Sequence, residues 1–221
     1  MRDQFIASLD QLKSSIFSMG KRAGADLARA IDAFREVDAE LAQMVRDADD
    51  ELDQQEVEHE QRIIQMIARH QPVAHDLRLL VSCLRVNWDV ERVGDLAGKI
   101  ARNTLRLPND PMIIPVDGIL NLADLASAMW SDALHAFLKE DADLAADLVT
   151  RDDAVDRVNG DIVRALLAMQ SDREEHVRAV ANIIGVCRQL ERVGDCAADI
   201  AMEVIYIKRG EQVRHLRPAA G

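Results

Sequence analysis

The sequence predicts an all-α protein built from two similar three-helix units, and three observations lead to this prediction. Ala, Leu, Val, Asp, Glu and Arg dominate the 221 residues, whereas aromatic residues make up 3% and prolines number five, a usage that favours long helices over sheets. Three of the prolines lie together within residues 108–115, where they would interrupt any helix. The pentapeptide ERVGD occurs at residues 91–95 and again at residues 191–195, which indicates an internal duplication.

The first unit is expected to span residues 1–107. Polar breaks near residues 34–38 and at residues 70–72 divide it into three helices, because such segments end the apolar periodicity of a helix. The proline-rich residues 108–115 are expected to form a linker between the units.

The second unit is expected to span residues 116–209, with breaks at residues 139–143 and 171–174. Ser171 and Glu174 have the spacing of a capping box, with Ser171 as the N-cap of the last helix. The remaining residues, 210–221, are expected to be a disordered tail. Each unit is therefore predicted to be an antiparallel bundle of three helices.

The last helix of each unit carries the clearest repeat. When residues 76–101 are aligned with residues 176–201, 10 of the 26 positions are identical. One apolar stripe, at helical spacing, is predicted to face the core in the first unit: Val86, Val90, Val93, Ala97 and Ile100. A neighbouring stripe runs through Leu77, Val81, Leu84 and Trp88 and then continues into Glu91 and Asp95. We expect this second stripe to begin as core and Trp88 and Trp130 to be core anchors.

The two ERVGD segments each place a glutamate and an aspartate one helical turn apart. Like charges at this spacing destabilise a helix slightly, and a glycine inside a helix costs roughly 1 kcal/mol. Two local penalties at one place, present twice, imply a compensating partner. That partner is either a cation between the carboxylates or a neighbouring helix that approaches closely over the glycine.

A second set of carboxylates with the same spacing lies upstream, in the middle helix of each unit. Together the candidate metal ligands are Asp49, Asp53, Glu91 and Asp95 in the first unit, and Asp152, Asp156, Glu191 and Asp195 in the second. Such oxygen ligands suit hard cations, and the ligand type alone does not choose among them. The alternative is that Arg92 and Arg192, or Arg78 and Arg178, neutralise the carboxylates in salt bridges without metal.

The composition argues against several other classes of protein. The formal net charge of −12 disfavours nucleic-acid binding, and no catalytic motif is present, so we expect no enzyme. The three cysteines lack the spacing of a metal site and are expected to be buried free thiols. Glu56 and His59 form a single ExxH motif, whereas ferritin-like di-iron enzymes need two; His59 is therefore expected at the surface.

The combination of these motifs resembles the PhoU family of phosphate-uptake regulators. The resemblance is carried by the repeated ERVGD with its upstream DxxxD segments, by QPVA at residues 71–74, by DLR at residues 76–78, and by the opening RDQF…MG of residues 2–20. It implies two three-helix bundles related by pseudo-twofold symmetry. It also implies multinuclear metal clusters, of iron, zinc, manganese or magnesium, on the eight carboxylates named above.

The same resemblance implies a function. The chain would be a cytoplasmic adaptor that links the ATPase component of the phosphate ABC transporter to a sensor histidine kinase, acts as a negative regulator of the phosphate regulon, and meets the membrane only through its partners. A homodimer is expected. Two rival hypotheses remain open from sequence: a metal-free structural interaction protein, and a metal-dependent enzyme of the ferritin-like kind.

Overall fold

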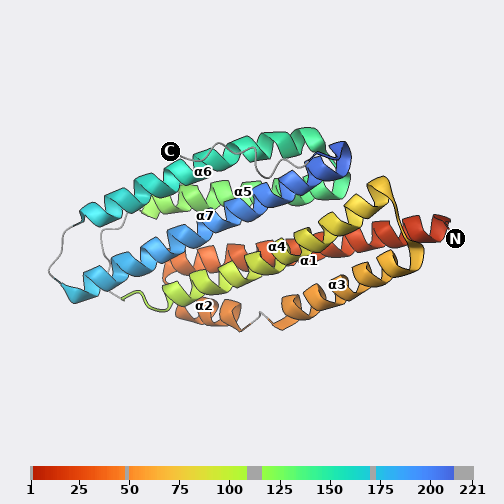
Figure 1. Ribbon diagram of the computed structural model, residues 1–221. Coiled ribbons are helices and arrows are strands. Elements are labelled where there is room, and N and C mark those ends of the chain that lie inside the picture. The colour runs from red at the N-terminus through yellow and green to blue at the C-terminus, as the bar shows by residue number, and fades with distance from the viewer. Residues whose placement is uncertain (1, 48–49, 109–115, 170–172, 212–221) are drawn as a thin grey trace.

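The structure, a computed structural model, describes residues 2–47, 50–108, 116–169 and 173–211. Within these ranges all regular secondary structure is helical, which confirms the all-α prediction (Figure 1). The helices are α1 (Arg2–Glu36), α2 (Ala39–Arg46), α3 (Asp50–His70), α4 (Ala74–Thr104), α5 (Val116–Lys139), α6 (Ala142–Ala168) and α7 (Glu174–Arg209). The six expected long helices are present, with the short helix α2 preceding α3 in the middle position of the first unit.

Several expectations fall on residues outside these ranges. Asp49, all of the linker except Pro108, and residues 212–221 of the tail are not among the described residues, so the proposed division into domains stays a prediction. Ser171, the expected N-cap of the last helix, also lies outside the described residues. In the structure the N-cap of α7 is Arg173, which makes no capping bond through its side chain, and Glu174 is the first helical residue.

The first helix of each unit ends in the same turn. At the end of α1, the amide of Asp38 donates to the carbonyl of Ala33 at 2.9 Å; at the end of α5, the amide of Asp141 donates to the carbonyl of Ala136 at 2.9 Å. These bonds define the Schellman motif, whose central residue adopts a left-handed conformation. Asp38 and Asp141 then cap the following helices with their carboxylates. The duplicated sequence thus forms a duplicated turn.

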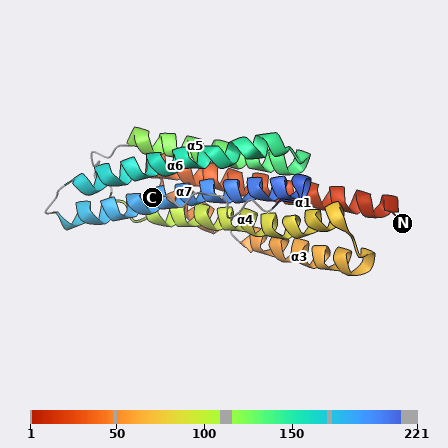
Figure 2. The same ribbon diagram turned by 45° about the horizontal axis from the view of Figure 1, so that its top comes forward.

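The two units pack side by side along their long axes. Helices α5 and α6 form one side of the molecule, α2 and α3 form the other, and α1, α4 and α7 lie between them (Figures 1 and 2). The most extensive helix pairing joins α4 to α7 across the two units. A single hydrophobic core runs through both of them.

Close contact between α1 and α5 depends on small residues. A Cβ atom placed on Gly20 would lie 2.5 Å from Leu134 Cδ2, and one placed on Gly24 would lie 3.1 Å from the Trp130 ring. Trp130 is buried, as expected, and its Nε1 donates to the carbonyl of Gly20 at 3.1 Å. These two glycines let the first helices of the units approach each other closely.

One of the two predicted stripes on α4 is core and the other is not. Val86, Val90, Val93, Ala97 and Ile100 are all buried, as predicted. The neighbouring stripe is wrongly predicted, because 38% of Leu77 and 49% of Trp88 remain exposed. The stripe follows the edge of the face that α4 buries against α1, α3 and α7. Among the helices described, none is long and apolar enough to span a membrane.

Candidate functional site

The two ERVGD segments meet at the middle of the contact between α4 and α7. The helices run antiparallel: Arg85 pairs with Glu203 at 3.0 Å on one side of the motifs, and Asn103 lies against Gly185 on the other. Residues 93–94 and 193–194 are buried between these two contacts. The repeat therefore marks the pseudo-twofold centre of the molecule, where each unit presents the same five residues to the other.

In the second unit, three of the expected carboxylates act on one another across the seam between α6 and α7. Burial raises the pKa of Glu191, and the charges of Asp195 and Asp156 raise it further. Burial likewise raises the pKa of Asp195, with Asp156 and Asp199 adding to the effect. Asp156 is itself exposed, and its pKa is raised by partial desolvation and by the charge of Asp153. This seam therefore concentrates negative charge that the fold does not fully neutralise.

The fourth carboxylate of this unit, Asp152, is fully buried in the same seam. A Cβ atom added to Gly194 would lie 3.2 Å from Val155 Cγ1 and 3.6 Å from Asp152 Oδ1. The glycine of this ERVGD motif therefore allows α6 to pass close to α7, which is one of the two explanations that the sequence left open.

The first unit has the same pattern of exposure at the corresponding place but a different balance of charge. Glu91 and Asp95 on α4 are partly buried and Asp53 on α3 is exposed, just as Glu191 and Asp195 are partly buried and Asp156 is exposed in the second unit. Lys99 Nζ lies 2.9 Å from Asp95 Oδ2, one turn further along the helix. Part of the charge of this motif is thus balanced within α4 itself.

Charged residues near the start of α3 were not anticipated from the sequence. Arg22 Nη1 of α1 lies 2.6 Å from Glu51 Oε2. Burial raises the pKa of Asp26 on α1, while Arg29 and Arg22 lower it and Glu51 raises it. Asp26 and Glu51 lie in neither repeated motif, and only the packing of α1 on α3 brings them together.

The seam between α6 and α7 and the corresponding seam between α3 and α4 are called the ERVGD seams. Their donors fit a hard cation by chemistry, because carboxylate oxygens are the ligands that Mg²⁺, Mn²⁺ and Ca²⁺ prefer. Their geometry is less complete. Among the described residues, no group of three or more His, Cys, Asp or Glu side chains is arranged to hold a metal ion. A cation bound between Asp156, Glu191 and Asp195 would require their side chains to turn toward one another.

The four arginines singled out in the sequence divide into two pairs. Arg92 and Arg192 lie at the centre, where both lower the pKa of Asp195. Arg78 donates through Nη2 to the carbonyl of Ile207 at 3.2 Å, and Arg178 pairs with Glu174 at 2.6 Å. Each of the second pair precedes its glutamate by 13 residues, or about 20 Å along the helix, so Arg78 and Arg178 do not neutralise the motif carboxylates.

His59 is buried, contrary to the expectation of a surface position. The amide nitrogen of Asn87 donates to the carbonyl of Glu56 at 2.9 Å, so Asn87 Oδ1 accepts from His59 Nδ1, also at 2.9 Å. His59 Nε2 then accepts from the hydroxyl of Ser15 at 2.7 Å. Burial lowers the pKa of His59. Both ring nitrogens are occupied, which removes the histidine that a ferritin-like site would need.

The three cysteines are free and buried, as expected. Burial raises the pKa of Cys83 and of Cys187 to about 12 and that of Cys196 still further. Thiols in this state are poor ligands and poor nucleophiles.

Comparison with known proteins identifies the family of this chain. A family model described as the PhoU domain matches residues 16–104 and, a second time, residues 119–204. The chain belongs to the PhoU family. The double match also confirms the internal duplication, with one PhoU domain in each half.

Curated PhoU relatives align with nearly the whole chain. The phosphate-specific transport system accessory protein PhoU homolog of Pseudomonas aeruginosa is 36% identical over 216 residues, covering 96% of this chain and 88% of the relative. The Clostridium acetobutylicum homolog is 32% identical and covers 96% and 97%. The crystal structure of PhoU from Pseudomonas aeruginosa superposes with a TM-score of 0.89 at 35% identity, covering 94% of this chain and all of that one.

Proposed function

We propose that this protein is an accessory regulator of phosphate transport. The observation that carries the proposal is the match of both units, and of 96% of the chain, to proteins named as accessory proteins of the phosphate-specific transport system. The match is not limited to one motif, because it includes both ERVGD segments and the helices that position them.

The finer proposal is that of a negative regulator that works as an adaptor on the cytoplasmic side of the membrane. It would bind the ATPase component of the phosphate ABC transporter and a sensor histidine kinase. Trp88 supports a protein-binding role for the α4 face, because 49% of its surface is exposed one turn before Glu91. Aromatic side chains of this kind are enriched at protein interfaces. We further propose a homodimer, which sedimentation velocity would test.

We also propose that a divalent cation or a cation cluster acts at the ERVGD seams. Asp152, Asp156, Glu191 and Asp195 would hold it in the second unit, and Asp49, Asp53, Glu91 and Asp95 in the first. A cation supplies positive charge where the pKa values of Asp156, Glu191 and Asp195 are raised. In the first unit the Lys99–Asp95 ion pair instead favours the metal-free hypothesis.

The adaptor proposal is tested by copurification of the untagged protein with the transporter ATPase and, separately, with the cytoplasmic part of the kinase. Trp88→Ala is expected to weaken at least one interaction tenfold or more, as loss of an interface aromatic does. Leu167→Ala is the matched control, because Leu167 is also exposed but lies on α6. Binding of neither partner to the native protein would refute the adaptor role.

The cation proposal is tested by elemental analysis of untagged protein. Asp156→Asn/Asp195→Asn is expected to lose metal from the second seam and Asp53→Asn/Asp95→Asn from the first. A native protein that remains folded, binds its partners and takes up no metal after reconstitution would establish the metal-free adaptor in its place.

A further inference from the structure

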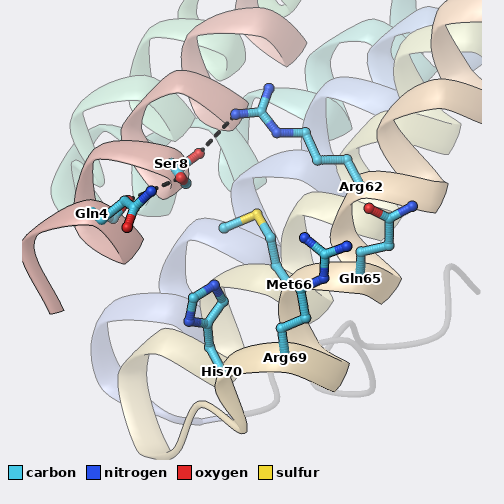
Figure 3. Close-up of a pocket in the computed structure, with 7 residues that line it drawn as sticks. All are labelled: Gln4, Ser8, Arg62, Gln65, Met66, Arg69 and His70. Carbon is cyan, nitrogen blue, oxygen red and sulfur yellow. Dashed lines mark hydrogen bonds between the residues drawn. The ribbon is translucent and has the colours of Figure 1, made fainter. Parts of the chain in front are cut away.

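A basic pocket lies between the first turns of α1 and the last turns of α3, far from the ERVGD seams along α3 (Figure 3). Its volume is about 370 Å³, and α3 contributes Arg62, Gln65, Met66 and Arg69 to it from successive turns of one helix face. His70 completes the α3 side, while Gln4 and Ser8 of α1 form the opposite wall. Among the described residues, every polar side chain that lines it is basic or neutral.

This lining is unusual for a chain with a formal net charge of −12. Among the residues that the structure describes, neither Arg62 nor Arg69 forms an ion pair with a carboxylate, whereas Arg22, Arg29, Arg85 and Arg151 do. The N-terminal end of α1 and the C-terminal end of α3 carry partial charges of opposite sign, so the side chains decide the charge of the pocket. The pocket therefore attracts anions.

Arg62 is already held in place by contacts within the protein. Arg62 Nη2 donates to the carbonyl of Ser8 at 3.3 Å and to Gln11 Oε1 at 2.8 Å. Both acceptors are neutral, so neither offsets the positive charge of the guanidinium, which has further N–H donors beyond these two bonds. A positioned guanidinium loses little freedom on binding, and its planar donors match two oxygens of a phosphate or carboxylate.

The pocket also has an apolar wall. The Met66 side chain is 6% exposed, and the His70 ring lies on Phe5 with ring centroids 4.8 Å apart. An inorganic phosphate ion would use the arginines and leave this wall uncovered, whereas a small phosphomonoester would use both. We propose that this pocket binds a phosphoryl group, presented either by inorganic phosphate or by a small phosphomonoester.

Isothermal titration of the metal-free protein with inorganic phosphate, with glycerol phosphate and with citrate tests this assignment. We expect saturable binding of at least one phosphate compound and weaker binding of citrate. Tighter binding of glycerol phosphate would identify a phosphomonoester as the ligand class, and equal or weaker binding would identify the free ion.

Two variants place the binding in this pocket. Arg62→Gln/Arg69→Gln is expected to weaken phosphate binding at least tenfold, and Gln65→Glu, which adds a carboxylate at an exposed position without altering Arg62, is expected to do the same. Arg157→Gln on α6 is the matched control and should bind as the native protein does. No saturable phosphate binding, citrate binding alone, or equal binding by the native protein and Gln65→Glu would overturn the proposal. Its outcome does not depend on whether the adaptor function proposed above holds.

Discussion

The two ERVGD motifs are identical, yet the residue one helical turn after each of them has opposite charge. Lys99 follows Asp95 in the first unit and pairs with it at 2.9 Å. Asp199 follows Asp195 in the second unit and raises the pKa of that carboxyl group. The negative charge of a duplicated motif can therefore be balanced in one copy and increased in the other, depending on a neighbouring residue outside the motif.

The interiors of the two units also differ, because equivalent positions are polar in the first unit and apolar in the second. The first contains the hydrogen-bonded set Ser15, His59 and Asn87. The matched turns, DxxxD segments and ERVGD segments place Gly118, Ile162 and Cys187 at the equivalent positions of the second unit. There a Cβ atom on Gly118 would lie 3.5 Å from Ile162 Cγ1, so apolar packing replaces the polar network. One backbone arrangement accommodates both solutions, provided that every buried polar group is satisfied.

The largest effect should come from forcing a side chain into the close contact between α6 and α7. Gly194→Leu would drive its side chain into Val155 and Asp152, beginning from a Cβ atom only 3.2 Å from Val155 Cγ1. We expect a loss of about 3 kcal/mol in the free energy of unfolding, measured by urea denaturation. Gly98→Leu is the control, because a Cβ atom there meets nothing within 4 Å. Equal destabilisation by the two substitutions would contradict the close approach over Gly194.

The next largest effect should come from removing the centre of the polar network. His59→Leu leaves Asn87 Oδ1 and the Ser15 hydroxyl without their partner, which should cost about 2 kcal/mol. Ile162→Val at the equivalent position of the second unit should cost about 1 kcal/mol. A smaller loss for His59→Leu than for Ile162→Val would show that the network contributes little.

The network also predicts a dependence on pH. Burial lowers the pKa of His59 below its ordinary value of 6.5, so the neutral ring stabilises the folded protein above pH 6.5, and this contribution is lost as the pH falls toward the folded pKa. Unfolding by urea at a series of pH values from 8 to 5 should show this loss in the native protein and not in His59→Leu. Parallel curves for the two proteins would refute it.

The sequence was sufficient to predict the helical fold and the core stripe, because these follow from periodicity within single helices, and the duplication, because the pentapeptide ERVGD is repeated. It failed where the answer depends on which helix lies opposite. Trp88 has core spacing but lies at the edge of the buried face of α4, and His59 has a surface-like neighbourhood in sequence but faces Asn87 and Ser15 from two other helices. The basic pocket was missed for the same reason, since Gln4 and Arg62 lie far apart in the chain.

A smaller effect is expected from exchanging the charges that distinguish the two motifs. In metal-free protein, Asp199→Lys should raise the free energy of unfolding at pH 7 by about 0.5 kcal/mol, and Lys99→Asp should lower it by about the same amount. The folded pKa values of Asp195 and Glu191 lie above their ordinary 3.8 and 4.5. The contribution of these two carboxyl groups to the free energy of unfolding is therefore present at low pH and is lost as the pH rises through their folded pKa values.

The same exchange tests the cation proposal. Asp199→Lys should reduce the loss of stability above pH 4.5, and it should weaken the stabilisation that added Mn²⁺ gives the native protein. Lys99→Asp should strengthen the stabilisation by Mn²⁺. If neither substitution changes the response to Mn²⁺, the charge difference between the two motifs has no bearing on cations.

The smallest effect concerns the turn that both units share. Val37 and Glu140 each have φ = 52°, a left-handed conformation that disfavours residues with a Cβ atom, and a β-branched valine most of all. Val37→Gly should therefore stabilise the protein by about 0.5 kcal/mol, read from the midpoint of thermal unfolding.

Glu140→Gly relieves the same conformation but should destabilise, because Glu140 Oε1 lies 2.6 Å from Lys13 Nζ and Oε2 lies 3.0 Å from His75 Nε2. Burial alone would raise the pKa of Glu140, yet the hydrogen bonds and charges of Lys13 and His75 lower it, which shows that these contacts outweigh the cost of burial. Stabilisation by both glycines would mean that the ion pairs at Glu140 contribute less than its backbone conformation costs, whereas opposite signs would show that the second unit retains a strained turn because the turn binds it to the first.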